Sequence, residues 1–252
     1  MTAFTSNTND NNSDISSLRY PVICIDGQSG AGKGTVTWRL AQTLGYQLLD
    51  SGALYRIVGL KAFEAGLLNV DAEQSIDEGA LLALTQSLQI VFEPNSDSGR
   101  VDIIVNGAKI GEQVRNETVG GYASRVAVYP KVRQALLKLQ QDMATQSGLV
   151  ADGRDMGTVV FPDADVKVYL TASAKARAER RVAQLLQAGQ TADFEAILAT
   201  IKARDDRDEN RATAPSKPAE DALVLDSSNL DADAVYELVK KHCQDQGICF
   251  NR

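Results

Sequence analysis

Short, uninterrupted runs of apolar residues alternate along this chain with longer stretches in which apolar residues recur every three or four positions. The first run, residues 22–25, ends at Asp26-Gly27. Runs of this length are typical of parallel strands that are buried on both faces. The other runs of this kind lie at residues 46–49, 149–151, 166–170 and 223–225. We therefore expect five buried strands.

Helical periodicity occupies the intervals between these runs. Val36, Leu40 and Leu44 are spaced four apart and Gly45 follows them, which predicts a helix that ends at the glycine. A second helical pattern, at steps of four, three and four, comprises Val132, Leu136, Leu139 and Met143. Residues 232–243 are expected to form a closing amphipathic helix. Strands that alternate with helices predict an α/β fold, with a parallel five-stranded sheet and helices on both of its faces.

One interval departs from that alternation. Residues 88–92 and 101–105 are rich in β-forming residues, the segment between them is polar, and Asn106-Gly107 follows at once. An Asn-Gly pair favours a tight turn between antiparallel strands. We interpret residues of about 70–115 as a small insertion that contains an antiparallel meander.

Composition narrows the classes of function. The 252 residues carry a formal net charge of −7, so the chain lacks the excess of Lys and Arg that displaces counterions from DNA or RNA. We expect no nucleic acid polymer as a partner. His242 is the only histidine, which argues against a His-based triad or a His-rich metal site. Three scattered cysteines make neither a disulfide framework nor a metal pair, which favours a reducing cytoplasm.

The beginning of the chain carries no targeting pattern. Residues 1–19 are polar, lack a basic-then-apolar signal, and are expected to be a disordered tail. No stretch approaches the ~18 apolar residues of a membrane span. We expect a cytoplasmic protein without a membrane partner, in which residues 20–252 form one domain. A monomer is expected because nothing in the sequence indicates an interface.

After the first strand, residues 27–33 match G-x-x-x-x-G-K, the pattern of a P-loop, and the nine-residue loop continues to residue 35. The glycines let successive N–H groups point inward around an anion, and the start of the next helix adds partial positive charge. Lys33 would reach the β- and γ-phosphates of ATP. A hydroxyl would help to hold Mg²⁺, and Thr35 follows Gly34, which occupies the usual Ser or Thr position. The residues expected to bind ATP are Gly27, Gln28, Ser29, Gly30, Ala31, Gly32, Lys33, Gly34 and Thr35.

A phosphate-binding loop alone does not distinguish an enzyme from a nucleotide-driven switch. A GTP-driven switch would carry a guanine-reading N-K-x-D segment, and the chain has none. A transport ATPase would need a longer chain with further motifs. The K-G-T ending of the loop is instead typical of small nucleoside monophosphate kinases. A nucleotide-dependent binding protein that hydrolyses ATP slowly stays the hypothesis from a different class.

Arginines from several segments are the candidates for the acceptor side. Transfer of a phosphoryl group between two anions mainly requires positioning and charge neutralisation. Arg56 and Arg154 lie near the expected ends of strands or helices. A further group falls at i, i+3, i+4 and i+7 of one expected helix face: Arg204, Arg207, Asp208 and Arg211. The alternative for such a face is a solvated charge stripe with internal salt bridges.

Three more blocks of sequence carry a family resemblance. Residues 50–56 read D-S-G-A-L-Y-R, residues 151–158 read A-D-G-R-D-M-G-T, and residues 204–211 read R-D-D-R-D-E-N-R. With the loop and residues 124–133, they resemble bacterial cytidylate kinases in the family's order, from about residue 20 to 239. Gln28 stands where many such kinases carry Pro, a departure expected to be mild because the loop glycines are intact. The N-terminal tail has no place in the family pattern.

The resemblance implies roles at the matching positions. The phosphate of the acceptor would be gripped by Arg56, Arg154 and Arg211. Cytosine carries an exocyclic amine that needs an acceptor such as a carboxylate. The base would be read by Ser124, Arg133 and Asp155. The remaining contacts to the acceptor would come from Ser51, Arg204 and Asp208, the last two at the sugar or the phosphate beside it.

The resemblance also implies a helical lid at about residues 174–200, which would close over ATP and exclude water. Arg177, Arg180 and Arg181 share a helical face in that region. Asp152 would hold Mg²⁺ or its waters together with Thr35, or would only cap the next segment. The catalytic residues implied are Lys33, Arg154, Arg177 and Arg181.

The expected reaction is the transfer of the γ-phosphoryl group of ATP to CMP, and to dCMP, giving ADP with CDP or dCDP. ATP would be the phosphate donor and Mg²⁺ the metal. The alternative is a kinase of the same architecture that acts on UMP or on another small acceptor such as shikimate.

Overall fold

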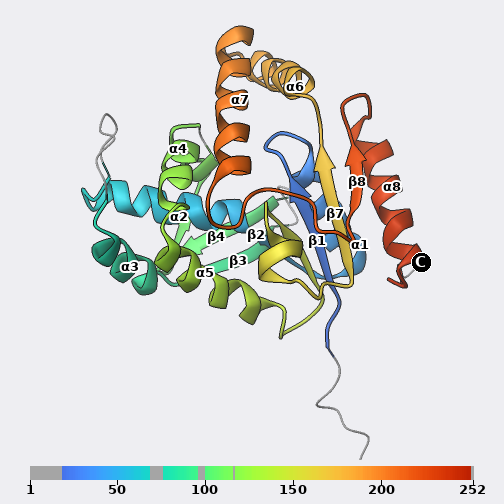
Figure 1. The fold of residues 1–252 in the computed structure, drawn as a ribbon, viewed down its shortest axis with the longest axis horizontal. Coiled ribbons are helices and arrows are strands. Elements are labelled where there is room, and N and C mark those ends of the chain that lie inside the picture. Colours follow the sequence, from blue (N-terminus) through green and yellow to red (C-terminus); the bar gives the residue numbers. More distant parts are fainter. Residues whose placement is uncertain (1–18, 69–75, 96–99, 116, 251–252) are drawn as a thin grey trace, which may run out of the picture.

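The computed structural model describes residues 19–68, 76–95, 100–115 and 117–250 (Figure 1). Its centre is a parallel sheet of five strands in the order β2-β6-β1-β7-β8. The strands are β1 (Val22–Gly27), β2 (Gln47–Asp50), β6 (Leu149–Asp152), β7 (Val166–Thr171) and β8 (Leu223–Asp226). All five expected strands and their parallel arrangement are confirmed.

Eight α-helices occur in the described part of the chain. They are α1 (Lys33–Leu44), α2 (Ser51–Glu64), α3 (Glu78–Ser87), α4 (Glu117–Val126), α5 (Pro130–Met143), α6 (Ala174–Gln187), α7 (Phe194–Asn210) and α8 (Ala232–Asp245). The helix predicted to stop at Gly45 does so, because Gly45 takes the left-handed conformation (φ 67°) and caps α1. Helix α3 was not predicted, and it begins where the side chain of Asp77 accepts hydrogen bonds from two helix N–H groups.

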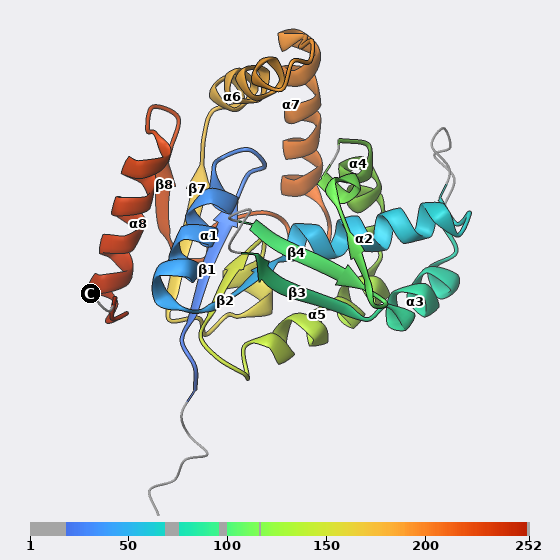
Figure 2. The ribbon, with the colours of Figure 1, turned by 180° about the vertical axis from the view of Figure 1, so that it is seen from behind.

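Alternate side chains of β1 belong to two hydrophobic cores. Val22 and Cys24 pack in one core, with residues of α2, α4 and α5. Ile23 and Ile25 pack in the other, with residues of α1 and α8. Because successive side chains of a strand point to opposite faces, helices cover the sheet on both sides, and Figures 1 and 2 show these elements from front and back. Every residue of β1 is buried, which explains its unbroken apolar run.

A second, antiparallel sheet of three strands lies between α3 and α4 in the sequence. It comprises β3 (Ile90–Asn95), β4 (Arg100–Val105) and β5 (Ala108–Ile110). β4 turns into β5 at Asn106-Gly107, where both residues have positive φ angles of 51° and 78°, as expected for an Asn-Gly turn. The antiparallel part of the fold prediction is thus confirmed. Residues 70–75 and 96–99 of the predicted insertion lie outside the described residues.

Helices α6 and α7 pack against each other and stand above the carboxyl edge of the parallel sheet (Figure 1). Residues 174–200, the predicted lid, comprise α6 and the first part of α7. After β6 the chain makes a π-helical turn at Met156–Val160, which no sequence pattern predicted. Within the described ranges, no helix is both long and apolar enough to cross a bilayer. The predicted tail falls outside those ranges, apart from Arg19.

Candidate active site

The phosphate loop connects β1 to α1 at the carboxyl edge of the sheet. Three of its glycines, Gly27, Gly30 and Gly32, have positive φ angles of 133°, 80° and 100°. A Cβ atom at Gly27 would stand 1.9 Å from the main-chain oxygen of Leu170 on β7, so only glycine fits there. Gly32, the N-cap of α1, has no side chain that could cover the first N–H groups of the helix. The loop therefore presents main-chain donors and the positive end of α1 to an anion.

Lys33 begins α1 and is buried beneath the loop. Its Nζ donates to the main-chain oxygen of Gln28 at 3.0 Å and lies 3.7 Å from Oδ1 of Asp152. Burial, and then the nearby charge of Arg154, lower the pKa of Lys33 to about 8. Burial raises the pKa of Asp152 to about 6, although Lys33 opposes that shift. The loop thus holds an ammonium group away from water, where its attraction for a phosphate is strong.

A cavity of about 660 Å³ opens beside the loop and brings most of the predicted site residues together. The predicted residues that line it are Ser29, Gly30, Gly32, Lys33, Gly34, Thr35, Ser51, Arg56, Ser124, Asp152, Arg154, Asp155, Arg204, Asp208 and Arg211. The predicted residues absent from its described lining are Gly27, Gln28, Ala31, Arg133, Arg177 and Arg181. Donor-side and acceptor-side candidates, far apart in the sequence, therefore share one cavity.

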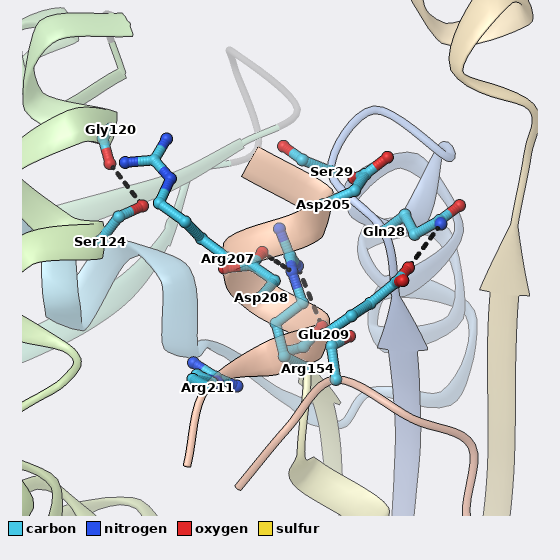
Figure 3. Close-up of polar contacts among 12 residues, drawn as sticks. Gln28, Ser29, Gly120, Ser124, Arg154, Asp205, Arg207, Asp208, Glu209 and Arg211 are labelled. Carbon is cyan, nitrogen blue, oxygen red and sulfur yellow. Dashed lines mark hydrogen bonds and ion pairs between the residues drawn. The ribbon is translucent and has the colours of Figure 1, made fainter. Parts of the chain in front are cut away.

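Arg154 and Asp208, which both line the cavity, form an ion pair. Nε of Arg154 donates to Oδ2 of Asp208 at 3.0 Å (Figure 3). Burial alone would raise the pKa of Asp208, but Arg154 and then Arg204 lower it below its ordinary value. Asp208 lies on α7, whereas Arg154 follows β6, so this pair joins the helix to the edge of the sheet. The carboxylate stays ionised and orients the guanidinium beside the cavity.

Asp155 and Arg133 form the second ion pair of the acceptor side. The guanidinium of Arg133, from α5, donates to Oδ2 of Asp155, and both side chains are buried. The guanidinium also lies over the ring of Tyr55, with its carbon 5.6 Å from the ring centre. Asp155 lines the cavity while Arg133 stands behind it. Arg133 therefore positions the one carboxylate that was predicted to read a base.

Ser124, Arg56 and Arg211 complete the acceptor-side wall. Oγ of Ser124 donates to the main-chain oxygen of Gly120 within α4 at 3.2 Å (Figure 3). Nη1 of Arg56 donates to the main-chain oxygen of Val114 at 3.0 Å. Nη2 of Arg211 is buried without a hydrogen-bond partner among the described residues. Because buried donors are normally paired, this atom indicates a place for a ligand acceptor.

Two of the predicted lid arginines, Arg177 and Arg180, contact different parts of the chain. Arg177 is buried and makes a two-pronged ion pair with Asp205 of α7, and its Nη1 also donates to the main-chain oxygen of Ser29 at 3.1 Å. Arg180 donates to main-chain oxygens after β8, at Ser227 and Leu230. Arg181 is partly exposed. Arg177 thus supports the phosphate loop from behind, beside a second cavity of about 570 Å³.

The expected helix face at residues 204–211 needs a correction at Arg207. Its side chain is exposed, its Nε donates to the main-chain oxygen of Ala203, and it does not line the main cavity. On a helix, the position three residues after Arg204 lies at the edge of the face that Arg204 and Asp208 share. Arg211 also lies just past the end of α7, in an extended conformation (φ −67°, ψ 140°).

Two carboxylates in this region were not predicted. Asp26, at the end of β1, is buried, and its two oxygens accept the N–H groups of Met156 and Gly157, each at 2.8 Å. It thereby anchors the π-helical turn that follows Arg154 and Asp155. Burial raises the pKa of Asp26 to about 6, against the effect of the hydrogen bond from Gly157. The available signal was a charged residue at the end of an apolar strand. Nothing in the sequence indicated that Asp205 pairs with Arg177.

Comparison with known proteins agrees with this geometry. The family model described as Cytidylate kinase matches residues 23–245. The chain belongs to the cytidylate kinase family. A cytidylate kinase from Pasteurella multocida (strain Pm70) is 53% identical over 85% of this chain and 91% of its own length.

Further family members show the same extent of similarity. A cytidylate kinase from Sodalis glossinidius (strain morsitans) is 49% identical over 89% of this chain and 95% of its own. Cytidylate kinase 1 of Haemophilus influenzae (strain ATCC 51907 / DSM 11121 / KW20 / Rd) is 49% identical over 91% and 96%. The family resemblance seen in the sequence blocks is thus confirmed.

Proposed function

We propose that this protein transfers the γ-phosphoryl group of ATP to the phosphate of CMP or dCMP, giving ADP with CDP or dCDP. The observation that carries the proposal is the main cavity. Lys33 and the phosphate loop line the same cavity as Arg154, Asp155 and Arg211. A phosphate donor and a phosphate-bearing acceptor can therefore occupy it together. Its family membership supports the same reaction.

The donor's phosphates would lie on the loop, where N–H groups and Lys33 neutralise the β- and γ-phosphates. An oxygen of the acceptor's phosphate attacks the γ-phosphorus as the bond to the β-phosphate oxygen breaks, and ADP leaves. No covalent enzyme intermediate forms. The attacking phosphate oxygen is already ionised at neutral pH, so no general base is required. Catalysis then consists of alignment and of charge stabilisation by Lys33 and Arg154.

The acceptor would be held by groups that the chain orients in advance. Arg56 and Arg211 would grip its phosphate, and the buried, unpaired Nη2 of Arg211 offers a donor for that purpose. Asp155 would accept a hydrogen bond from the exocyclic amine of cytosine, with Arg133 and Ser124 beside it. Uracil has a carbonyl oxygen at that position, which a carboxylate repels. Cytosine selectivity follows from this difference.

Thr35 and Asp152 fit a magnesium site that is completed by the donor. Both residues offer oxygen atoms to the cavity, and Mg²⁺ in nucleotide sites is held by one or two such groups together with phosphate oxygens and water. The described residues contain no cluster of three or more His, Cys, Asp or Glu side chains that could hold a metal by themselves. When bound, the metal would neutralise part of the negative charge of the donor's phosphates.

The pair of helices α6 and α7 is proposed to act as the lid over ATP, with Arg177 and Arg181 as its arginines. Arg177 contacts both the loop, through Ser29, and α7, through Asp205. A movement of α7 would therefore be transmitted to the loop that holds the phosphates. Closure would exclude water and so protect ATP from hydrolysis.

The test is release of ADP from ATP and Mg²⁺ with CMP, dCMP, UMP, AMP or no acceptor. We expect rapid turnover with CMP and dCMP and little with the others, and a matched preparation of Lys33→Ala reports contaminating kinases. Turnover with UMP equal to that with CMP would contradict the assigned base reading. Slow hydrolysis that no acceptor stimulates would instead contradict the transfer reaction and favour a nucleotide-dependent binding protein.

A further inference from the structure

The side chain of Gln28 in the phosphate loop connects three segments of the chain. Its Oε1 accepts a hydrogen bond from Oγ1 of Thr171, the last residue of β7, at 3.0 Å. Its Nε2 donates to Oε1 of Glu209, in the last turn of α7, at 3.1 Å (Figure 3). Its main-chain oxygen accepts from Nζ of Lys33. Gln28 therefore links the loop both to the sheet and to α7.

The chemistry of the partners fixes the orientation of this amide. A carboxylate such as that of Glu209 only accepts hydrogen bonds, so it must face the NH₂ group of Gln28. The amide oxygen then faces Thr171, whose hydroxyl can donate. The opposite orientation would place two acceptor oxygens against each other. Both polar ends of the side chain are used, and each has the partner that suits it.

Glu209 lies where a carboxylate needs such a donor. The carboxyl end of a helix carries partial negative charge, which disfavours a second negative group in its last turn. Two other carboxylates of α7 are held by arginines, Asp205 by Arg177 and Asp208 by Arg154. Glu209 is held by the neutral amide of Gln28. The contact fixes the turn that carries Asp208 and leads directly into Arg211.

We propose that Gln28 is a positioning residue that ties the last turn of α7 to the phosphate loop and thereby places Asp208 and Arg211 for the acceptor. The consequence for kinetics rests on the proposed function. Neither Gln28 nor its side-chain partners Thr171 and Glu209 line the main cavity. The tie is therefore expected to adjust acceptor binding without contacting the reacting phosphates.

Swapping the amide and the carboxylate between positions 28 and 209 tests the proposal. Gln28→Glu places two carboxylates opposite each other, and we expect the KM for CMP to rise about 3- to 10-fold, which corresponds to the loss of one hydrogen bond. Because the new carboxylate lies in the phosphate loop, the KM for ATP is also expected to rise in this variant, and the tie is therefore judged from the KM for CMP in the exchanged pair. Glu209→Gln alone should change little, because an amide still accepts from an amide. The double variant, Gln28→Glu with Glu209→Gln, restores a donor facing a carboxylate and should return the KM to within about twofold of the original.

Amide hydrogen exchange in residues 204–211, measured without nucleotide, reports on the tie independently of any reaction. Gln28→Glu should accelerate exchange there about 3- to 10-fold, and the double variant should reverse this. If Gln28→Glu does not fold, the same measurement is made on Gln28→Ala. Glu195→Gln removes an exposed charge at the other end of α7 and should leave hydrogen exchange in residues 204–211 unchanged.

The proposal is overturned if the double variant does not return the KM for CMP and the rate of hydrogen exchange in residues 204–211 to their original values. Restored exchange in a protein that does not phosphorylate CMP would retain the tie between the loop and α7, and would overturn the proposed function together with the acceptor role inferred for the tie.

Discussion

The proposed donor side and the proposed acceptor side of the main cavity are built in opposite ways. The phosphate loop is nine consecutive residues that run from the last residue of β1 into the first turn of α1. The acceptor side takes Arg56 from α2, Ser124 from α4, Asp155 from the segment after β6, and Asp208 from α7. A contiguous loop needs mainly its own glycines and its flanking elements. A dispersed wall exists only after helices from distant parts of the chain have packed.

The two sides also differ in how they hold charge. On the loop side, Lys33 contacts a main-chain oxygen and stands 3.7 Å from Asp152. On the acceptor side, arginines and carboxylates form closer pairs, such as Arg154 with Asp208 at 3.0 Å. A substitution in the loop should therefore remove one interaction with the phosphates. A substitution in the acceptor wall should also leave its partner buried without a counter-charge.

Removal of the loop's ammonium group should have the largest effect on the reaction. Lys33→Ala is expected to lower kcat by about 10²–10³-fold, because a preorganised charge at the transferred phosphoryl group is lost. The unfolding transition should stay cooperative, since the charged form of Lys33 is already disfavoured by burial. Lys61→Ala removes a partly exposed partner of Glu64 and is the matched control, with kinetics expected to be unchanged. Near-normal turnover of Lys33→Ala would refute the donor-side assignment.

The acceptor wall is tested by Asp155→Ala, with a smaller expected effect on a different quantity. Loss of a charge-assisted hydrogen bond of about 1.5–3 kcal/mol should lower the preference for CMP over UMP roughly tenfold to a hundredfold. The measurement is the ratio of kcat/KM for the two acceptors. Because Arg133 would lose its buried partner, Asp155→Asn, which keeps one acceptor oxygen, is the companion variant for stability. An unchanged ratio in both variants would move base reading to another residue.

Asp26 connects the end of β1 to the turn that follows Asp155, and its expected effect is the smallest and concerns stability. Its folded-state pKa of about 6 lies above the ordinary value of 3.8. Between about pH 4 and 6 the folded chain keeps a proton that the unfolded chain releases, so this group's contribution to the free energy of unfolding falls as pH rises. Asp26→Asn has no such proton. The unfolding free energy of the original protein minus that of the variant should fall by about 1–3 kcal/mol between pH 4 and 7.

Urea unfolding of both proteins at intervals of pH measures this difference. At low pH, where Asp26 is protonated, Asp26→Asn should cost about 1–3 kcal/mol. The NH₂ group of Asn, unlike the hydroxyl oxygen of a protonated carboxyl, cannot accept a hydrogen bond, so one of the N–H groups of Met156 and Gly157 loses its acceptor. Parallel pH curves for the two proteins would show that the buried carboxyl ionises normally.

Local pattern was sufficient for the parts of the molecule in which neighbours in sequence determine the structure. The five strands, the helix that ends at Gly45 and the turn at Asn106-Gly107 follow from apolar periodicity and from backbone preferences. The π-helical turn at Met156–Val160 could not be predicted this way, because it depends on hydrogen bonds to Asp26, about 130 residues earlier. Arg207 was misplaced because a helical face defined by spacing alone does not show where the helix meets the cavity.

The same contrast applies to the candidate residues. The loop residues could be assigned from chemistry alone, since glycines and a lysine at fixed spacing bind phosphate wherever a strand and a helix flank them. The acceptor residues were assigned through family resemblance. Physical reasoning identified arginines as necessary without showing that Arg133 stands outside the cavity lining and contacts Asp155 and Tyr55, which do line it. The pairing of Arg177 with Asp205 likewise depends on how α6 packs against α7.

The strand order has a consequence for folding of the chain during its translation. β1, which carries the phosphate loop, lies between β6 and β7. Its first hydrogen-bonded neighbour is complete only when residue 152 has been translated, and its second only at residue 171. At the ordinary rate of synthesis, roughly 7–30 seconds separate the loop from the strands that support it. During that interval the apolar segment of β1 has no complete set of partner strands. A nascent chain released before β7 would therefore be a target for chaperones and proteases.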